Sequence, residues 1–234
     1  MNRKIKNKKI IAIIPARGGS KGIPRKNVKL LAGKPMIAYT VEAALKSKYL
    51  DRVIVSTEDK EIAETSKKYG VEVIKRPKRL ATDKAGLTDV ISHVLDILRR
   101  ENYIPKLIIL LQPTSPLRNT DDINQATELF LKDKAEFLIS VCPAEHPPCW
   151  GFMIKNKYLK PIFEPKYLEM TRQDLPKSYM PNGAIYIFAP EVLSKYKSFH
   201  SNKTLPYIMP PERSVDIDNE MDFMLAELII NKDK

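Results

Sequence analysis

A loop rich in glycine and basic residues follows the first apolar run of the chain and has the composition of a phosphate-binding site. Residues 10–14 read Ile-Ile-Ala-Ile-Ile, and residues 15–27 read Pro-Ala-Arg-Gly-Gly-Ser-Lys-Gly-Ile-Pro-Arg-Lys-Asn. Glycines let backbone N–H groups approach an anion closely, and Arg and Lys provide the countercharge. A strand that leads into such a loop at the edge of an α/β sheet is where nucleotide phosphates usually bind. We interpret the stretch as a diphosphate or triphosphate site, with a basic turn that binds no ligand as the alternative.

The spacing of the glycines separates this loop from two common nucleotide-binding motifs. The run Gly18-Gly19-Ser20-Lys21-Gly22 fits neither G-x-x-x-x-G-K-[ST] nor G-x-G-x-x-G. The sequence therefore disfavours both a P-loop ATPase and a dinucleotide-binding oxidoreductase. The crowded positive charges of the loop would repel one another unless an anion lay among them, and this favours a bound ligand.

Two aspartates near the C-terminus have the spacing of a magnesium site. One residue separates Asp216 from Asp218 in an extended segment, so both carboxylates point the same way. Two like charges side by side are unfavourable unless a cation lies between them, and Mg²⁺ with phosphate oxygens is the natural occupant. The alternative is that one of the two aspartates caps the helix that follows.

Polar residues also follow two other apolar runs, at the edge where the ligand crevice of a parallel sheet lies. Gln112, Thr114, Ser115 and Arg118 follow one run, and their amide, hydroxyl and guanidinium groups suit a polyhydroxylated acid. Arg76 follows another run and offers a planar donor to a base or a phosphate. Each feature alone could be a turn or a surface arginine, but the topology brings such strand ends together.

The elements that must position these residues alternate between strand and helix, which predicts an α/β protein with a mostly parallel sheet and helices on both faces. The expected strands are 10–14, 52–56, 71–75, 106–111, 137–141 and 184–188. The expected helices are 36–46, 59–69, 88–101, 120–132, 190–196 and 219–230. The strand at 106–111 is fully apolar, so we expect it at the centre of the sheet.

Residues 143–181 interrupt this alternation. They contain seven prolines with aromatic residues between them, which is typical of an insertion that covers an active site, forms a dimer contact or packs as a meander on the core. We expect a single domain over residues 10–234 that contains this insertion. The preceding residues 1–9 are strongly basic, which is typical of a solvated terminus.

The composition is consistent with one domain that handles an anion. The chain has 234 residues, 43% of them hydrophobic, and a formal net charge of +12, which allows a sizeable core and suits an anionic small molecule. Cys142 and Cys149 lack a zinc-binding pattern, which favours reduced thiols and a cytoplasmic location. The sequence shows no signal peptide and no run near the roughly 20 apolar residues of a membrane span, so we expect no membrane partner.

Six segments resemble the acylneuraminate cytidylyltransferases, the CMP-sialic acid synthetases. They occur in the order typical of that family between about residues 10 and 230. Besides the Gly-rich loop they are Val-Ser-Thr-Glu-Asp, Leu-Gln-Pro-Thr-Ser-Pro-Leu-Arg, Arg-Gln-Asp-Leu-Pro, Pro-Asn-Gly-Ala-Ile-Tyr and Ser-Val-Asp-Ile-Asp. The resemblance implies a Rossmann-like nucleotidyltransferase fold and an enzyme that joins CTP to a nine-carbon 2-keto sugar acid, releases pyrophosphate and uses Mg²⁺. It also implies a homodimer in which the insertion reaches toward the partner's site, with no nucleic acid as a partner.

The resemblance assigns roles to residues at matching positions. The residues expected to bind the triphosphate and the nucleoside are Arg17, Ser20, Lys21, Asn27, Arg76, Thr82 and Asp83. Those expected to bind the sugar acid are Gln112, Thr114, Ser115, Arg118, Arg172, Asn182, Tyr186 and Phe199. Asp216 and Asp218 match the Mg²⁺ carboxylates and, with Arg17 and Lys21, form the expected catalytic set.

One position departs from the family pattern. Met180 stands before Pro-Asn-Gly, where the family often has arginine. A diacetamido sugar acid of the legionaminic or pseudaminic type therefore fits as well as N-acetylneuraminic acid. The alternatives are another nucleotidyltransferase, such as one for 3-deoxy-octulosonate, and a non-catalytic module that binds nucleotides or nucleic acid. The second alternative would have no use for Asp216 and Asp218, which would repel a polyanion.

Overall fold

The computed structural model describes residues 9–20, 22–82 and 85–232. Within them, a seven-stranded sheet has the strand order β11-β7-β10-β6-β1-β4-β5. Its strands are β1 (Ile10–Pro15), β4 (Arg52–Thr57), β5 (Glu72–Lys75), β6 (Leu107–Leu110), β7 (Phe137–Pro143), β10 (Tyr179–Phe188) and β11 (Thr204–Ile208). Every pairing is parallel except the two that β10 makes with β6 and β7. This confirms the predicted mostly parallel α/β sheet, with the apolar strand β6 at its centre.

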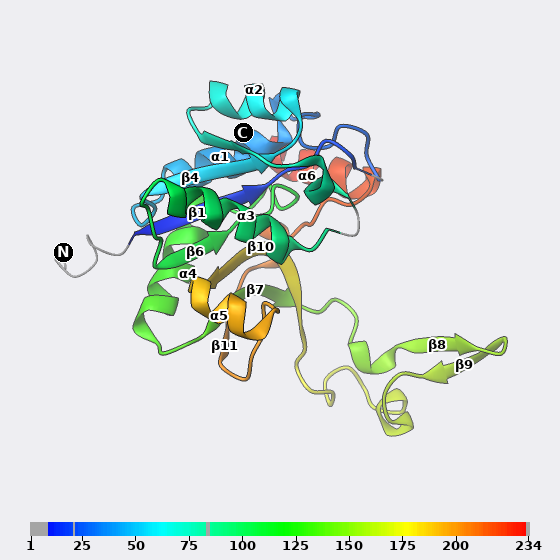
Figure 1. Ribbon diagram of the computed structural model, residues 1–234. Coiled ribbons are helices and arrows are strands. Elements are labelled where there is room, and N and C mark those ends of the chain that lie inside the picture. The colour runs from blue at the N-terminus through cyan, green and yellow to red at the C-terminus, as the bar shows by residue number, and fades with distance from the viewer. Residues whose placement is uncertain (1–8, 21, 83–84, 233–234) are drawn as a thin grey trace.

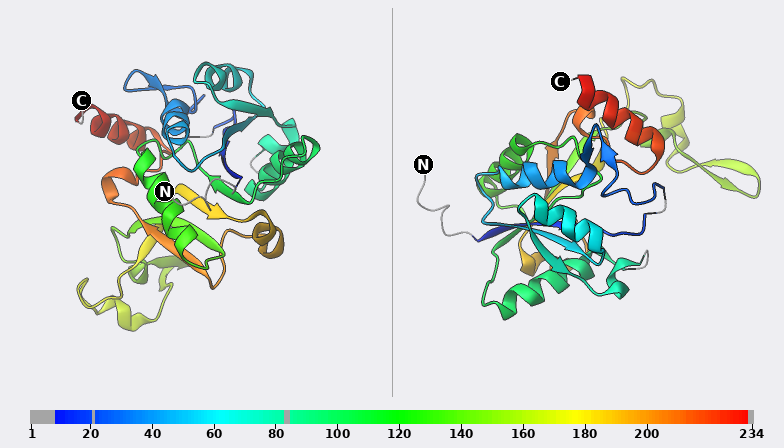
Figure 2. Two further views of the ribbon diagram at one scale, coloured as in Figure 1. Left: turned by 90° about the vertical axis from the view of Figure 1, so that its left-hand side faces the viewer. Right: turned by 90° about the horizontal axis from the view of Figure 1, so that it is seen from above.

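The helices of the described chain cover both faces of the sheet (Figures 1 and 2). They are α1 (Met36–Leu45), α2 (Lys60–Lys68), α3 (Leu87–Arg100), α4 (Thr120–Lys132), α5 (Pro190–Tyr196) and α6 (Glu220–Lys232). Alternate residues of β1 point to opposite faces. Ala12 and Ile14 pack in one apolar cluster with α1, α2 and α4, whereas Ile11 and Ile13 pack in another with α3 and α5. The period-2 burial of β1 therefore fixes which helices lie on each side.

A third apolar cluster lies at the carboxyl edge of the sheet. Ile23 from the Gly-rich loop, Ile217 from the aspartate segment and Phe223 from α6 are buried together with Leu31 and Met36. Leu31 belongs to a small hairpin of β2 (Leu30–Leu31) and β3 (Lys34–Pro35). The burial of three segments in one cluster holds the N-terminal loop and the C-terminal aspartates side by side.

The insertion forms an arm that projects from the body (Figure 1). It contains an antiparallel hairpin of β8 (Phe152–Lys155) and β9 (Tyr158–Pro161), flanked by short 3-10 turns at Pro148–Trp150 and Pro165–Leu168. The hairpin is exposed along its whole length, and Ile154 retains 77% of its accessible surface. An exposed apolar hairpin of this kind is a candidate contact surface.

The C-terminal return to the sheet depends on a buried carboxylate. β11 leads into a 3-10 turn at Pro211–Arg213, and the Arg213 guanidinium donates two hydrogen bonds of 3.0 Å to Asp122 of α4. The Asp122 side chain is only 1% exposed and also completes the capping box of α4 with Asn119. The Tyr207 hydroxyl of β11 donates a hydrogen bond to the same carboxylate.

This arrangement predicts a stability cost for removing the arginine. Arg213→Met leaves Asp122 as a buried carboxylate without its cation, so we expect a loss of about 2–3 kcal/mol in the free energy of unfolding. Urea denaturation monitored by circular dichroism measures it. The control is Arg99→Met, which breaks an exposed pair with Asp96 and should cost less than about 0.5 kcal/mol. Equal unfolding midpoints for the two variants would contradict the prediction.

Candidate active site

A cavity of about 430 Å³ opens at the carboxyl ends of β1, β5 and β6. Its polar side comprises Arg17, Ser20, Lys26, Asn27, Gln112, Thr114 and Asp218, and its apolar side comprises Leu80, Ala85, Leu87 and Val90. Arg76 and Thr82 also line it. Strand ends that are far apart in the sequence therefore meet around one hollow, as the parallel topology requires. Lys21 and Asp83 were predicted for this site and lie outside the described residues.

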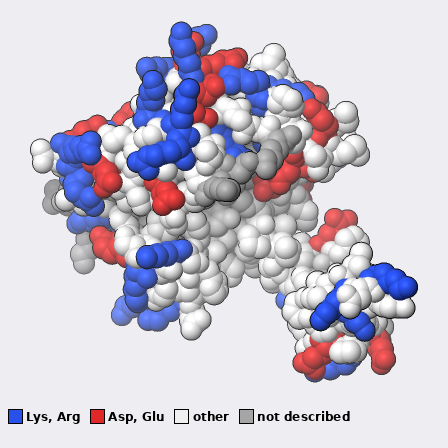
Figure 3. Space-filling model, turned by 45° about the vertical axis from the view of Figure 1, so that its right-hand side comes forward, with Lys and Arg blue, Asp and Glu red and all other residues white. Residues whose placement is uncertain are grey.

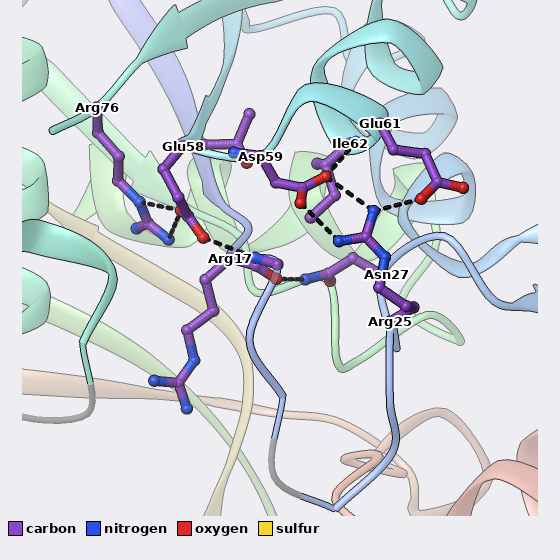
Figure 4. A network of polar contacts seen from close by, with 10 residues as sticks. Arg17, Arg25, Asn27, Glu58, Asp59, Glu61, Ile62 and Arg76 are labelled. Atoms are coloured by element: carbon purple, nitrogen blue, oxygen red, sulfur yellow. Dashed lines mark hydrogen bonds and ion pairs between the residues drawn. The ribbon is translucent and has the colours of Figure 1, made fainter. Parts of the chain in front are cut away.

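The entry to the Gly-rich loop is held by the two acidic residues that follow β4 (Figure 4). Glu58 accepts a hydrogen bond of 2.8 Å from the Gly18 amide and a second of 3.0 Å from Arg76 Nε. Asp59 caps α2 through the Ile62 amide and pairs with Arg25. A Cβ at Gly18 would lie 2.5 Å from Asp59 Oδ2, so a larger residue there would displace the Asp59 carboxylate from its present position.

The far end of the loop packs directly on the aspartate segment. A Cβ at Gly22 would lie 1.9 Å from the backbone oxygen of Asp218, a contact that excludes any side chain. Lys26 is nearly buried; its ammonium donates to the Ile217 carbonyl and lies 3.4 Å from Asp218 Oδ1. The Ile217 amide in turn donates to the Thr114 carbonyl at 2.8 Å. The aspartate segment is thus fixed between the loop and the turn after β6.

Asp216 does not line the cavity, as Asp218 does, but lies in a recess bounded by Thr114 and Gly183. Ile217 is fully buried, whereas Asp216 and Asp218 on either side of it are exposed. Partial burial raises the pKa of Asp216, the nearby charges of Asp218 and Asp222 raise it further, and a hydrogen bond with Thr114 opposes both. Burial and the charge of Asp216 likewise raise the pKa of Tyr186. The neighbouring carboxylates therefore create a local excess of negative charge that a cation would relieve.

The carboxylate oxygens of Asp216 and Asp218 supply some, but not all, of the ligands that a hard divalent cation needs. Carboxylate oxygens are the ligands that Mg²⁺ prefers, and it commonly takes only one or two of them together with phosphate oxygens. Within residues 9–20, 22–82 and 85–232, no cluster of three or more His, Cys, Asp or Glu side chains could hold a metal ion by itself. A metal at Asp216 and Asp218 would therefore need oxygens from a ligand to complete its coordination.

Several residues predicted to contact the sugar lie beneath the cavity instead. Ser115 is fully buried and donates to the Asn182 carbonyl, and the Asn182 side chain bonds to Ser140 and Ser214. Arg118 is 1% exposed and donates to Thr40 and to the carbonyls of Gln112 and Ala184. Burial lowers the pKa of Arg118 to about 10, so the guanidinium stays charged near neutral pH. None of Ser115, Asn182 and Arg118 lines the cavity, and most of their donors bond to protein groups, although Arg118 Nη1 is buried without a hydrogen-bond partner among the described residues. Their direct contact with the sugar stays a prediction.

The remaining predicted sugar residues divide between the recess and the arm. Tyr186 packs against Phe199 with ring centroids 5.6 Å apart, and Phe199 also packs against Phe188 on the α5 face of the sheet. Gly183 has φ +72, and a Cβ there would lie 3.1 Å from Asp216 Oδ2, which ties the β10 backbone to the aspartate. Arg172 lies at the base of the arm, in a separate hollow formed with Pro143 and Tyr179. In a single chain, Arg172 therefore does not line the nucleotide-sized cavity.

Two residues of the site, Glu58 and Lys26, were missing from the predicted set. Glu58 follows β4 directly, so the strand-end rule that singled out Gln112 and Arg76 applies to it as well. Lys26 belongs to the basic loop, but its partners are nearly two hundred positions away. Gly183 is needed for its positive φ, and the Pro-Asn-Gly sequence was the available signal for such a turn.

Solved structures share this fold. One is CMP:2-keto-3-deoxy-manno-octonic acid synthetase complexed with CTP, with a TM-score of 0.73 at 17% identity over 97% of this chain and 100% of that one. Another is 4-diphosphocytidyl-2C-methyl-D-erythritol synthase from Anaerococcus prevotii, with a TM-score of 0.68 at 13% identity over 99% and 100%. At these identities the likeness shows the fold alone. Together with the family match that follows, it defines the protein as an enzyme of the nucleotidyltransferase class.

A family model described as cytidylyltransferase matches residues 11–199, so the chain belongs to the cytidylyltransferase family. N-acylneuraminate cytidylyltransferase of Escherichia coli is 39% identical over 96% of this chain, and the chain spans about half (52%) of that protein's length. CMP-N,N'-diacetyllegionaminic acid synthase of Legionella pneumophila is 38% identical over 95% of this chain and 96% of its own length. Pseudaminic acid cytidylyltransferase of Campylobacter jejuni is 34% identical over 94% and 96%.

The raised pKa of Asp216 predicts how stability changes with pH. Because the folded pKa lies above the unfolded one, the folded state binds more protons between the two values, and ionisation of Asp216 destabilises it as pH rises through that window. In metal-free buffer, Asp216→Asn should therefore unfold at the same or a higher temperature than the wild type at pH 7. Its advantage should shrink as pH falls below the folded pKa. Calorimetry at a series of pH values tests this, and a clear loss of stability in the variant at pH 7 would overturn it.

Proposed function

We propose that this protein transfers the cytidylyl group of CTP to a nonulosonic acid, a nine-carbon 2-keto sugar acid, and releases pyrophosphate. The observation that carries the proposal is the packing of the basic Gly-rich loop against the Asp216–Asp218 segment at the rim of one cavity. Relatives that are named for three different nonulosonic acids and match nearly the whole chain support the substrate class.

The reaction assigns a separate task to each side of the cavity. A base takes the proton of the sugar's anomeric hydroxyl, and the hydroxyl oxygen forms a bond to the α-phosphorus of CTP. The bond between that phosphorus and the bridging oxygen breaks, and pyrophosphate leaves with the bonding pair. Arg17, Ser20 and Lys21 bind the phosphates and stabilise the charge that develops on them. The apolar side with Arg76 and Thr82 holds the base, and Asn27 positions the nucleoside. Gln112 and Thr114 meet the sugar.

A magnesium ion is part of the proposal. Asp216 and Asp218 would hold it together with phosphate oxygens, and when bound it would neutralise the charge that builds up on the transferred phosphate. Burial is the main cause of the raised Asp216 pKa, and the charges of Asp218 and Asp222 add to it; a bound cation would offset this cost of ionisation, which supports the assignment. The same carboxylates would repel a nucleic-acid backbone, so we expect no nucleic acid to bind here.

The sugar is one of the nonulosonic class, and Met180 bears on which one. Met180 is half exposed at the start of β10, where the family often has an arginine. A thioether cannot hold a carboxylate, and it presents an apolar surface that suits an acylamino methyl group. This favours a diacetamido acid of the legionaminic or pseudaminic type as the first substrates to test beside N-acetylneuraminic acid.

We also propose a homodimer assembled through the arm. The arm stands apart from the body as a separate lobe (Figure 3), and its hairpin exposes Phe152, Met153, Ile154, Tyr158 and Leu159. In such a dimer, Arg172 at the base of one arm meets the sugar in the partner's cavity, which accounts for the distance of Arg172 from the cavity of its own chain.

No helix of the described chain is long and apolar enough to cross a membrane. Both cysteines are free thiols, which supports a cytoplasmic location.

The activity is tested by pyrophosphate release from CTP and Mg²⁺ with a panel of sugar acids. The panel contains N-acetylneuraminic, legionaminic, pseudaminic and 3-deoxy-octulosonic acids, with UTP as the control nucleotide. We expect Asp218→Asn to lower kcat by about a thousandfold, roughly 4 kcal/mol in the barrier, with an unchanged melting temperature. Glu220→Gln, next to this segment and paired with the half-buried Lys29, is the matched control. No pyrophosphate with any sugar, or near-normal turnover in Asp218→Asn, would refute the assignment.

Mixing two inactive variants tests whether Arg172 acts across the dimer. Chains with Arg172→Ala and chains with Asp218→Asn are each expected to be inactive as pure dimers. In a mixed dimer, the site that keeps Asp218 receives an intact Arg172 from the partner, so the mixture should recover about a quarter of the wild-type rate. Ile154→Asp with Leu159→Asp should abolish dimerisation in light scattering and prevent this recovery. A mixture that stays inactive, from chains shown to exchange, would exclude the role across subunits.

A further inference from the structure

Glu58 is a carboxylate in a site built to attract anions, and its position calls for an explanation. Its side chain is 14% exposed, and it follows β4 at the same sheet edge as the Gly-rich loop. Its two oxygens have different partners: Oε1 accepts from the Gly18 amide at 2.8 Å, and Oε2 accepts from Arg76. One carboxylate therefore joins the start of the phosphate loop to the arginine beside the apolar half of the cavity (Figure 4).

We infer that Glu58 is a positioning residue. It orients Arg76 toward the nucleotide base and fixes the position of the Gly-rich loop relative to Arg76. This inference rests on the proposed function, because it takes the apolar side of the cavity as the base site. It goes further by assigning base selectivity to a pair, the Glu58 carboxylate and the Arg76 guanidinium, and by linking that pair to the loop.

The geometry restricts how Arg76 can meet a base. Its Nε and Nη2 both lie 3.0 Å from Glu58 Oε2, so one edge of the guanidinium is committed to the carboxylate, and Nη1 is on the other side. The backbone amide of Arg76 donates to the Thr57 carbonyl, which fixes the root of the side chain. Arginine only donates hydrogen bonds. The acceptor pair formed by O2 and N3 of cytosine therefore suits it, whereas uracil presents an N–H at the corresponding ring position.

Electrostatics gives Arg76 a second task. A carboxylate in contact with the Gly18 amide would repel a triphosphate held by that loop unless a cation neutralised it. The Arg76 side chain is 4% exposed, and its pairing with Glu58 is therefore weakly screened by solvent. Loss of Arg76 would expose the bound triphosphate to the Glu58 charge, in addition to removing the base contact.

The test is equilibrium binding of CTP, UTP and CMP, measured by calorimetry without any sugar acid. The proteins compared are the wild type, Glu58→Gln, Arg76→Met and the variant with both changes. Glu58→Gln keeps the acceptor for Gly18 and removes the carboxylate that holds Arg76. We expect its preference for CTP over UTP to fall about tenfold, while triphosphate affinity in general does not fall because a negative charge is lost. Glu64→Gln, an exposed residue of α2 paired with Lys60, is the matched control and should match the wild type.

The charge argument also predicts how Arg76→Met changes the affinity for nucleotides. Arg76→Met should weaken CTP more than CMP, because the unpaired Glu58 repels each added phosphate. Adding Glu58→Gln to it should recover triphosphate affinity but not the preference for cytosine. Arg76→Lys, which keeps the charge but not the two-nitrogen contact, should keep triphosphate affinity and lose base preference, and it replaces Arg76→Met if that variant does not fold.

Three outcomes would overturn the inference, and they separate it from the proposed function. Equal CTP-to-UTP affinity ratios in Glu58→Gln and Glu64→Gln exclude the positioning role, even when the wild type turns over CTP. Equal weakening of all nucleotides together with a lower melting temperature indicates a purely structural residue. Absence of CTP binding to the wild type overturns the inference and the proposed function together.

Discussion

The contact between the Gly22 backbone and the Asp218 carbonyl is the constraint on which the rest of the site depends. It joins the first loop of the chain to a segment near its end, and Lys26 reinforces it with its bond to the Ile217 carbonyl, 191 positions away. Burial of Ile23 and Ile217 in one apolar cluster stabilises the junction from below. The apolar residues bring the segments together, and the charged residues on either side of them, basic in the loop and acidic in the segment, are left facing one cavity. The site is therefore a consequence of packing between two remote apolar side chains.

The alternation of strands and helices could be predicted because the segments that form β1, β4 and β6 are short apolar runs, each bounded by turn residues. The central place of β6 could be predicted because residues 107–111 are all apolar, and the four residues of the strand are buried. The strand β11 and the start of β10 could not be predicted in the same way. β11 has Pro206 in its middle, which weakens any strand signal and is tolerated because the strand lies at the sheet edge. The first three residues of β10 are exposed and lead out of the arm, so they lack the apolar pattern that marks the second half of the strand.

The sequence predicted which types of residue form the candidate site, but not which of these residues are buried. Gln112 and Thr114 line the cavity, whereas Ser115 and Arg118 of the same turn are buried beneath it. Adjacent residues of a tight turn point to opposite sides, and the sequence does not state which side faces solvent. Glu58 shows the complementary difficulty. Its importance comes from bonds to Gly18 and Arg76, which belong to two other segments, and no local pattern around Glu58 records those partners.

The separation between a rigid nucleotide half and an exposed arm bears on where sugar specificity resides. The proposed nucleotide half is fixed by Gly22, which admits no side chain, and by the largely buried pair of Glu58 and Arg76, so it has little freedom to vary. Met180 lies elsewhere, half exposed where β10 leaves the sheet toward the arm, and Arg172 lies at the base of that arm. Under the proposed dimer, these groups and the partner's counterparts surround the sugar. Relatives named for three different sugar acids would then differ chiefly at this junction, because a change there leaves the packing of the loop on the aspartate segment untouched.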